Sequence, residues 1–298
     1  MSYSAKIRAS WELFRLSLQI LQKNPKLYLF PVVSTVCALA ILLFFFAPIL
    51  VVVFASVWGV AAVSPHADWD AIAARYNTAM YLYGAALYIT SMFVATFMNV
   101  AFYNEILRAL AGEAVSLRHG LKFASGRLGA ILMWTLLAAT VGLIIRAIEE
   151  RLGWIGKIVM AAIGTAWSVA AVFAIPVLIR RTDNNPLAVL RDSVGTLKRT
   201  WGESLAGFVG FRLAGMMFFL FSVGLLVPAI ILAIVFSQFW IAAAAGVVWL
   251  LAMFVSSFLI NMATHVYRCA LFVYASEGVV PVPYTPDMMN AGWKVKKA

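Results

Sequence analysis

Charged residues are scarce in this sequence. Asp, Glu, Lys and Arg make up 12% of the 298 residues, whereas hydrophobic residues make up 64%. A soluble domain needs about 25% charged residues to cover its surface. With so little charge, much of the surface has to face lipid rather than water. The composition therefore predicts a membrane protein and excludes a soluble globular one.

Residues that commonly carry chemistry are also few. The two cysteines are isolated from each other, and the three histidines fall in separate segments. They have neither the spacing of metal ligands nor that of a disulfide framework. The sequence also lacks the P-loop, HExxH and GxSxG motifs. We therefore expect no catalytic residue, no metal site, no cofactor and no enzymatic activity.

Long apolar runs are abundant. A helix needs about 20 apolar residues to cross the hydrocarbon core of a bilayer. Runs of this kind occupy 27–63, 79–103, 128–145, 158–179 and 213–260. The last run is about twice as long as one crossing needs, and its most polar point, Ser237-Gln238, predicts a turn. The fold class that we expect is an all-α membrane protein with about six spanning helices in three hairpins.

The segments between the runs complete the predicted topology. We expect the first span to tilt, to kink at Pro48 or to emerge on the far side. Residues 64–70 are predicted to form a loop, and 146–153 a short charged turn. A single membrane domain is expected over 1–280, with a basic tail over 281–298.

Basic residues predict the orientation. Of the 23 Lys and Arg residues, 18 lie before the first span, between spans two and three, between spans four and five, or after the sixth. Cytoplasmic segments of membrane proteins carry the excess of Lys and Arg. We therefore expect both termini in the cytoplasm, and the membrane to be the cytoplasmic (inner) membrane of a bacterium or archaeon.

Three amphipathic segments precede the three outbound spans. Their apolar residues recur at intervals of three and four, which predicts helices. Ser116 and Asn185 are the expected N-caps of the second and third, and Asn24-Pro25 is expected to open the first span. The chain thus resembles three copies of one unit, over about 1–112, 113–185 and 186–280. The apolar sets are Ile7, Trp11, Phe14, Leu18 and Leu21, then Leu117, Leu121, Ala124 and Leu128, then Leu187, Leu190, Val194, Leu197 and Trp201.

The basic faces of these helices suggest a partner. Clusters of Lys and Arg beside a span attract anionic lipid headgroups. We expect such contacts, and no nucleic acid, despite the net charge of +11. Alternatively, the helices only pack under the bundle and set the angle of the next span. A second copy of the chain and another membrane protein both remain open as protein partners. The expected headgroup contacts are Lys6, Arg8, Arg15, Lys198 and Arg199.

A second set of polar residues lies near the cytoplasmic ends of the predicted spans. Such groups are costly in hydrocarbon and usually face the interior of a bundle. They predict a polar vestibule for an anion, and so a transport or channel function. The alternatives are that the arginines reach headgroups and the asparagines join helices, and that the chain organises membrane lipid or a partner as a scaffold. The vestibule residues are Asn99, Glu105, Arg212, Asn261, His265 and Arg268.

Several segments resemble a family of bacterial and archaeal integral membrane proteins of unknown function. They are SWEL at 10–13, PKLYLFP at 25–31, RLGAILMW at 127–134, ATVGLIIRAIEER at 139–151 and YRCALFVYASEGVVP at 267–281. The resemblance implies six membrane helices and no particular activity. A weaker likeness, in the basic start and the two spaced prolines, is to sulfate-permease-like proteins.

Overall fold

The computed structural model describes residues 3–57, 69–199 and 216–285, the last range with gaps at 217–218, 221, 225 and 229. All regular structure in these ranges is helical, and five helical segments are long and apolar enough to cross a membrane. They are Pro25–Val51, Asn77–Leu110, Leu128–Arg151, Gly156–Arg180 and Ala242–Glu277. The all-α membrane architecture is confirmed.

The chain divides into two compact units. One unit comprises 26–105 and 116–193, and the other comprises 1–25, 106–115 and 194–298. The first unit contains the first two pairs of apolar helices, and the second contains the helices near the two ends of the chain.

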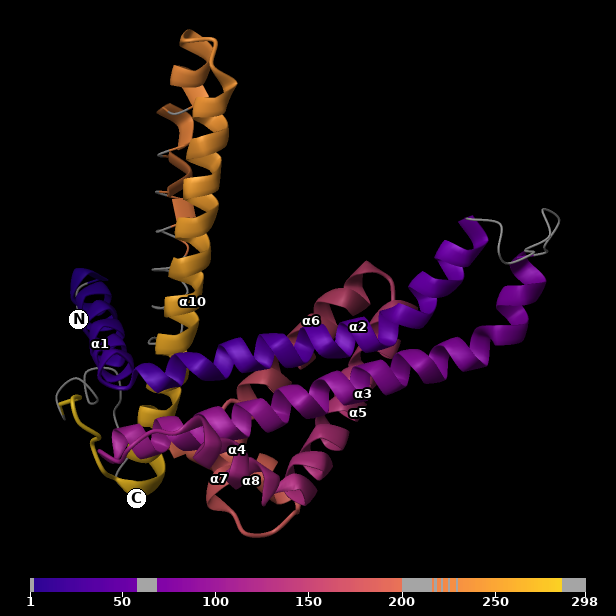
Figure 1. The fold of residues 1–298 in the computed structure, drawn as a ribbon. Helices are drawn as coiled ribbons and strands as arrows, with labels where there is room; N and C mark the ends of the chain where they lie inside the picture. Colours follow the sequence, from indigo (N-terminus) through magenta and orange to yellow (C-terminus); the bar gives the residue numbers. More distant parts are fainter. Residues whose placement is uncertain are drawn as a thin grey trace. The chain divides into compact units, whose positions relative to one another are not determined.

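The first pair consists of α2 (Leu29–Val57) and α3 (Trp69–Leu110), which lie side by side (Figure 1). Ring contacts join Phe30 to Phe102 and Phe45 to Tyr83, with centroids 5.5 and 5.3 Å apart, so the helices run antiparallel. Away from these contacts the apolar side chains are exposed, as at Phe44, which is 75% exposed. Large apolar side chains left open in this way fit a surface that faces lipid.

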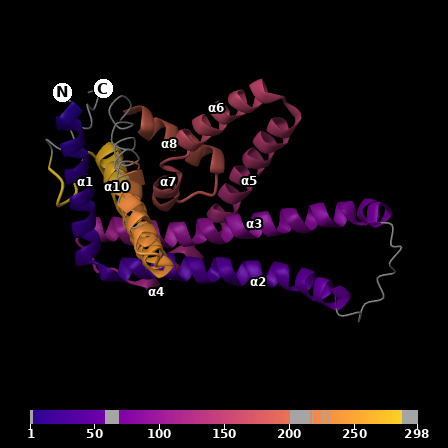
Figure 2. The same ribbon diagram turned by 90° about the horizontal axis from the view of Figure 1, so that it is seen from above.

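The second pair consists of α5 (Leu128–Arg151) and α6 (Trp154–Ala170), which form a hairpin (Figure 2). The rings of Trp134 and Trp167 stack between them, 6.3 Å apart. The predicted fourth span is interrupted after Ala170 and resumes as α7 (Ala174–Arg180). A proline clashes with the carbonyl four residues before it, so Pro176 is incompatible with an unbroken helix at Val172.

In the other unit, α1 (Tyr3–Lys23) packs against α10 (Phe239–Glu277). The segment after α10 also reaches α1, because the hydroxyls of Ser17 and Tyr284 lie 2.8 Å apart. A shorter apolar helix, Ser222–Val235, precedes α10, and the indole N–H of Trp249 donates to Ser222 Oγ at 3.1 Å. The turn predicted at Ser237-Gln238 is confirmed, with Ser237 at a φ of 53°.

Helix α2 is continuous through Pro48, as neighbouring helices and local adjustments allow in membrane helices. The tilt, kink or far-side exit expected of the first span stays a prediction. Two predicted boundaries are wrong. Trp69 and Asp70 belong to α3 rather than to a loop, whereas 64–68 lie outside the described residues. The expected turn at 146–153 is helical up to Arg151, where Arg146 and Glu150 pair along the helix surface at 3.0 Å.

All three surface helices form, as α1, α4 (Leu117–Ser125) and α8 (Pro186–Arg199). Asn185 caps α8 as predicted, since its Oδ1 accepts the N–H groups of Leu187 and Ala188. Ser116 occupies the N-cap position of α4, but its side chain makes no cap bond. Asn24 donates back to the carbonyl of Ile20 and therefore ends α1, and a 3-10 helix, Pro25–Tyr28, leads into α2.

The buried face of α1 differs from the predicted one. Leu13, Ser17, Ile20 and Leu21 are buried, whereas Trp11 is 62% exposed. The helix therefore packs by one flank of its apolar face and leaves the other flank open. A tryptophan open beside a basic face is typical of a helix that lies in the membrane interface.

Candidate functional site

The structure places the predicted vestibule residues as follows. Glu105 is fully buried, and Asn99, on the same helix, is exposed. On α10, Asn261 is exposed, while His265 and Arg268 are partly buried. Arg212 lies outside the described residues. These residues fall in two compact units of the chain, and the vestibule that would combine them stays a prediction.

The carboxylate of Glu105 makes several hydrogen bonds. It is buried near the end of α3. Its Oε2 accepts the backbone N–H of Ser116 at 2.7 Å, and its Oε1 lies 2.6 Å from Nδ1 of His119 and 3.1 Å from Nδ2 of Asn104. A buried carboxylate is tolerated when hydrogen bonds replace its hydration. Glu105 therefore joins α3 to the first turn of α4.

Close packing at Gly120 supports this junction. A methyl group added there would lie 2.8 Å from the carbonyl oxygen of Ala101 and 2.9 Å from both Cγ of Glu105 and Cζ of Phe30. Only glycine lets the two helices approach so closely. Gly120 and Ala124, which lie one turn apart, are the buried residues of α4. Helix α4 therefore packs against α3 through its own smallest side chains.

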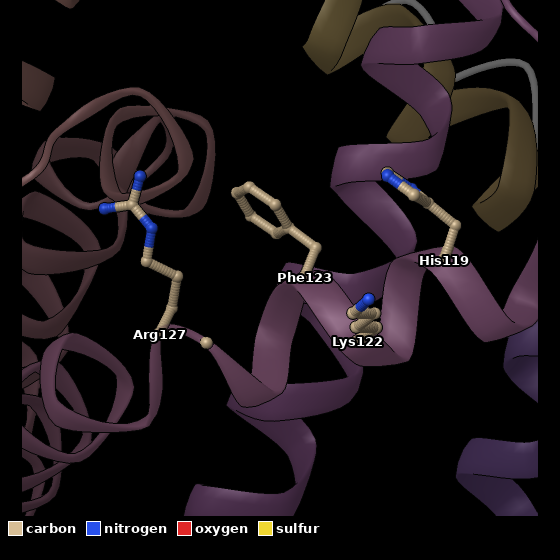
Figure 3. Close-up of a pocket in the computed structure, with 5 residues that line it drawn as sticks. His119, Lys122, Phe123 and Arg127 are labelled. Atoms are coloured by element: carbon tan, nitrogen blue, oxygen red, sulfur yellow. The ribbon is translucent and has the colours of Figure 1, made fainter.

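A flank of α4 borders an open hollow of about 370 Å³, lined by His119, Lys122, Phe123, Gly126 and Arg127 (Figure 3). In Figure 3, His119 and Arg127 lie on either side of Phe123. The imidazole of His119 is 47% exposed, so it reaches from the buried carboxylate to the hollow. Lys122 is exposed. Three of the five residues that line the hollow are basic, and its exposed lining surface is mostly apolar.

Arg127 is held in place from two sides. Its guanidinium lies 5.6 Å from the ring centroid of Phe123, and it donates to the backbone carbonyls of Arg181 and, at 3.4 Å, Ile179. These carbonyls belong to the end of α7, where a cation is favoured by the helix dipole. Arg127 therefore connects the start of α5 to the end of α7.

An ion cluster fixes the linker from α7 to α8. Nε of Arg181 lies 2.7 Å from Oδ1 of Asp183, and a second guanidinium nitrogen bonds Asp192 on α8. The hydrogen bond from Arg181 lowers the pKa of the Asp183 carboxyl, so both partners stay charged at neutral pH. On the same helix, Lys198 and Arg199 remain exposed.

Sequence reasoning did not find the role of Ser193. This buried hydroxyl donates to the carbonyl of Ala170 at 2.6 Å and accepts the N–H of Phe173 at 3.1 Å. It thus satisfies backbone groups at the interruption between α6 and α7. Pro176 was the available signal for the interruption, but nothing in the sequence pattern indicates that Ser193 bridges it.

The contacts of basic residues with lipid headgroups stay a prediction. Arg15 on α1 is exposed, like Lys198 and Arg199 on α8. Lys6 and Arg8 also belong to α1. In the sequence, each of these helices precedes an apolar run.

Comparison with known proteins gives one family. No curated protein and no solved structure matches the chain. The expected resemblance to an uncharacterised family is confirmed, and the likeness to sulfate-permease-like proteins stays a prediction. A family model, described as a family of unknown function (DUF6159), matches residues 74–281. The chain, a multi-pass membrane protein by the length and hydropathy of its helices, belongs to this family.

Proposed function

We propose that this protein organises anionic lipid at the cytoplasmic face of a bacterial or archaeal inner membrane. Its six spans cross the membrane with both termini in the cytoplasm, and the three basic surface helices α1, α4 and α8 lie beside these spans. It catalyses no reaction, and its partners are lipid headgroups rather than nucleic acid. Five helices of the described residues are long and apolar enough to cross a membrane, and the proposal assigns the sixth span to the segment that contains the shorter apolar helix Ser222–Val235.

One observation supports this proposal most. Each surface helix buries a narrow face and leaves basic side chains exposed beside a span: Arg15 on α1, Lys122 on α4, and Lys198 and Arg199 on α8. Near an anionic surface, each such cation contributes about 1 kcal/mol. Several cations on one membrane face therefore favour anionic over neutral lipid strongly.

A second candidate is transport of an anion through the predicted vestibule. The interruption between α6 and α7 favours it, because discontinuous helices form the binding sites of many transporters. In that case Arg212, His265 and Arg268 would attract the anion, and the chain would act alone, as a homo-oligomer or with another membrane protein.

Lipid selectivity tests the first proposal. In nanodiscs of mixed lipid, electron paramagnetic resonance measures the association of spin-labelled phosphatidylglycerol and phosphatidylcholine with the protein. We expect a severalfold preference for phosphatidylglycerol at low salt. At about 1 M salt the Debye length is about 3 Å, so the preference should largely disappear.

Two triple variants identify the basic residues that cause the preference for phosphatidylglycerol. Replacing Arg15, Lys198 and Arg199 with glutamine should remove most of it. Replacing Arg146, Arg151 and Lys157, around the α5–α6 turn, should remove less, because Arg146 already pairs with Glu150. Equal association of both lipids with the unmodified protein, or equal effects of the two variants, would contradict the proposal.

A further inference from the structure

The hollow beside α4 has features that diffuse attraction to lipid does not need. Its basic side chains, His119, Lys122 and Arg127, approach from one short stretch of chain. His119 and Lys122 are three residues apart on α4, so they share a face of the helix. The lining thus concentrates groups that bind anions around one space rather than spreading them over a surface.

Two of these three side chains are already oriented. Nδ1 of His119 donates to the Glu105 carboxylate at 2.6 Å, so the ring is fixed and Nε2 of the neutral imidazole is an acceptor. Arg127 uses two of its N–H groups on the carbonyls of Ile179 and Arg181, and a guanidinium has five. Three therefore remain. Side chains held before binding lose less entropy when a ligand arrives.

The charge of the hollow favours one ligand class. The hollow is open and has a volume of about 370 Å³. Lys122 and Arg127 supply two permanent charges. A phosphomonoester carries about −1.5 to −2 at neutral pH, whereas a phosphodiester carries a single charge. The match favours the monoester.

The surroundings of the hollow favour a lipid as the source. Arg127 immediately precedes α5, the start of a candidate span. Leu128 and Leu132, in the first turns of that helix, are 46% and 43% exposed. A headgroup in the hollow would therefore leave its acyl chains beside an open apolar surface. A soluble phosphomonoester would gain nothing from that surface.

We infer that the hollow is a binding site for the phosphomonoester headgroup of a membrane lipid. This inference rests on the proposed function and adds a defined site to it. Lys122 and Arg127 donate to the phosphate oxygens, and His119 and Phe123 form the sides of the site.

Titration of the purified full-length protein in neutral detergent tests the site. The probes are dioctanoyl phosphatidic acid, dioctanoyl phosphatidylglycerol and glycerol 3-phosphate, and binding is followed by calorimetry at pH 7.5. We expect phosphatidic acid to bind at least several times more tightly than either other probe. Lys122→Gln should weaken phosphatidic acid binding about fivefold, the effect of one cation worth about 1 kcal/mol. Lys122 is exposed, so this variant should fold.

Arg118→Gln is the matched control, because Arg118 is an exposed cation of α4 that does not line the hollow. It should change phosphatidic acid binding by less than twofold. Equal losses in the two variants, or equal binding of the two lipids, would overturn the site and leave the proposed function standing. Equal binding of glycerol 3-phosphate and phosphatidic acid would overturn the lipid source. The proposed function itself fails by a different result, the absence of any lipid selectivity in nanodiscs.

Discussion

Replacing Glu105 with alanine is expected to lower the free energy of unfolding by about 2–4 kcal/mol. The change removes the acceptor for Ser116 N–H, His119 and Asn104, and it leaves a cavity where α4 meets α3. Unfolding in mixed micelles with a denaturing detergent measures the loss. Glu105→Gln, which keeps one carbonyl oxygen, should lose less than the alanine variant.

The control for this prediction is Glu150→Ala. Glu150 is also a carboxylate paired with a basic side chain, but its side chain is 66% exposed. Exposed pairs contribute about 0–1 kcal/mol, so this variant should unfold almost like the unmodified protein. If Glu105→Ala also left the free energy of unfolding unchanged, the carboxylate would not hold α4 in place.

The same substitution at two glycines should have opposite effects. Gly120→Ala places a methyl group 2.8 Å from the backbone oxygen of Ala101, which cannot move aside cheaply. Overpacking of this kind costs about 1–3 kcal/mol. Gly195, on the equivalent helix α8, has nothing within 4 Å of the added methyl group. Gly195→Ala should therefore stabilise the protein by about 0.5–1 kcal/mol, since alanine favours a helix.

Thermal unfolding of the two variants in the same detergent measures both changes in stability. Stabilisation by both substitutions would mean that α4 does not approach α3 closely. Gly120→Ala should also alter phosphatidic acid binding, because displacement of α4 moves His119, Lys122 and Phe123, which line the hollow. Gly195→Ala should leave that binding unchanged.

Apolar length sufficed to predict the five long helices, because it is a property of single segments. The surface helices were predictable from their spacing, and Asn185 from its position just before Pro186. The packed flank of α1 was not, because a broad apolar stripe is compatible with docking through Trp11 or through Leu13 and Ser17. The choice depends on contacts with α10 and Tyr284, far away in the sequence.

The candidate site was predictable only in part. Glu105 stood out as an ionisable group near the end of a span, and the basic set of α4 was recognisable. Their pairing was not, because His119 comes 14 residues later and meets Glu105 only after the chain reverses. The interruption between α6 and α7 had a local signal in Pro176. Ser193 bonds the backbone groups at the interruption because of how α8 packs, and no local sequence pattern indicates that packing.

The central claim is that the basic surface helices lie on one side of the membrane. In a chain whose Cys37 and Cys269 are replaced by alanine, single cysteines at Ala114, Thr182 and Leu152 can be labelled with a membrane-impermeant maleimide. All three positions are exposed and lie between helices. Cysteines at Ala114 and Thr182 should react only after the cells are permeabilised, whereas one at Leu152 should react in intact cells. Labelling of Ala114 and Thr182 from opposite sides would contradict the account.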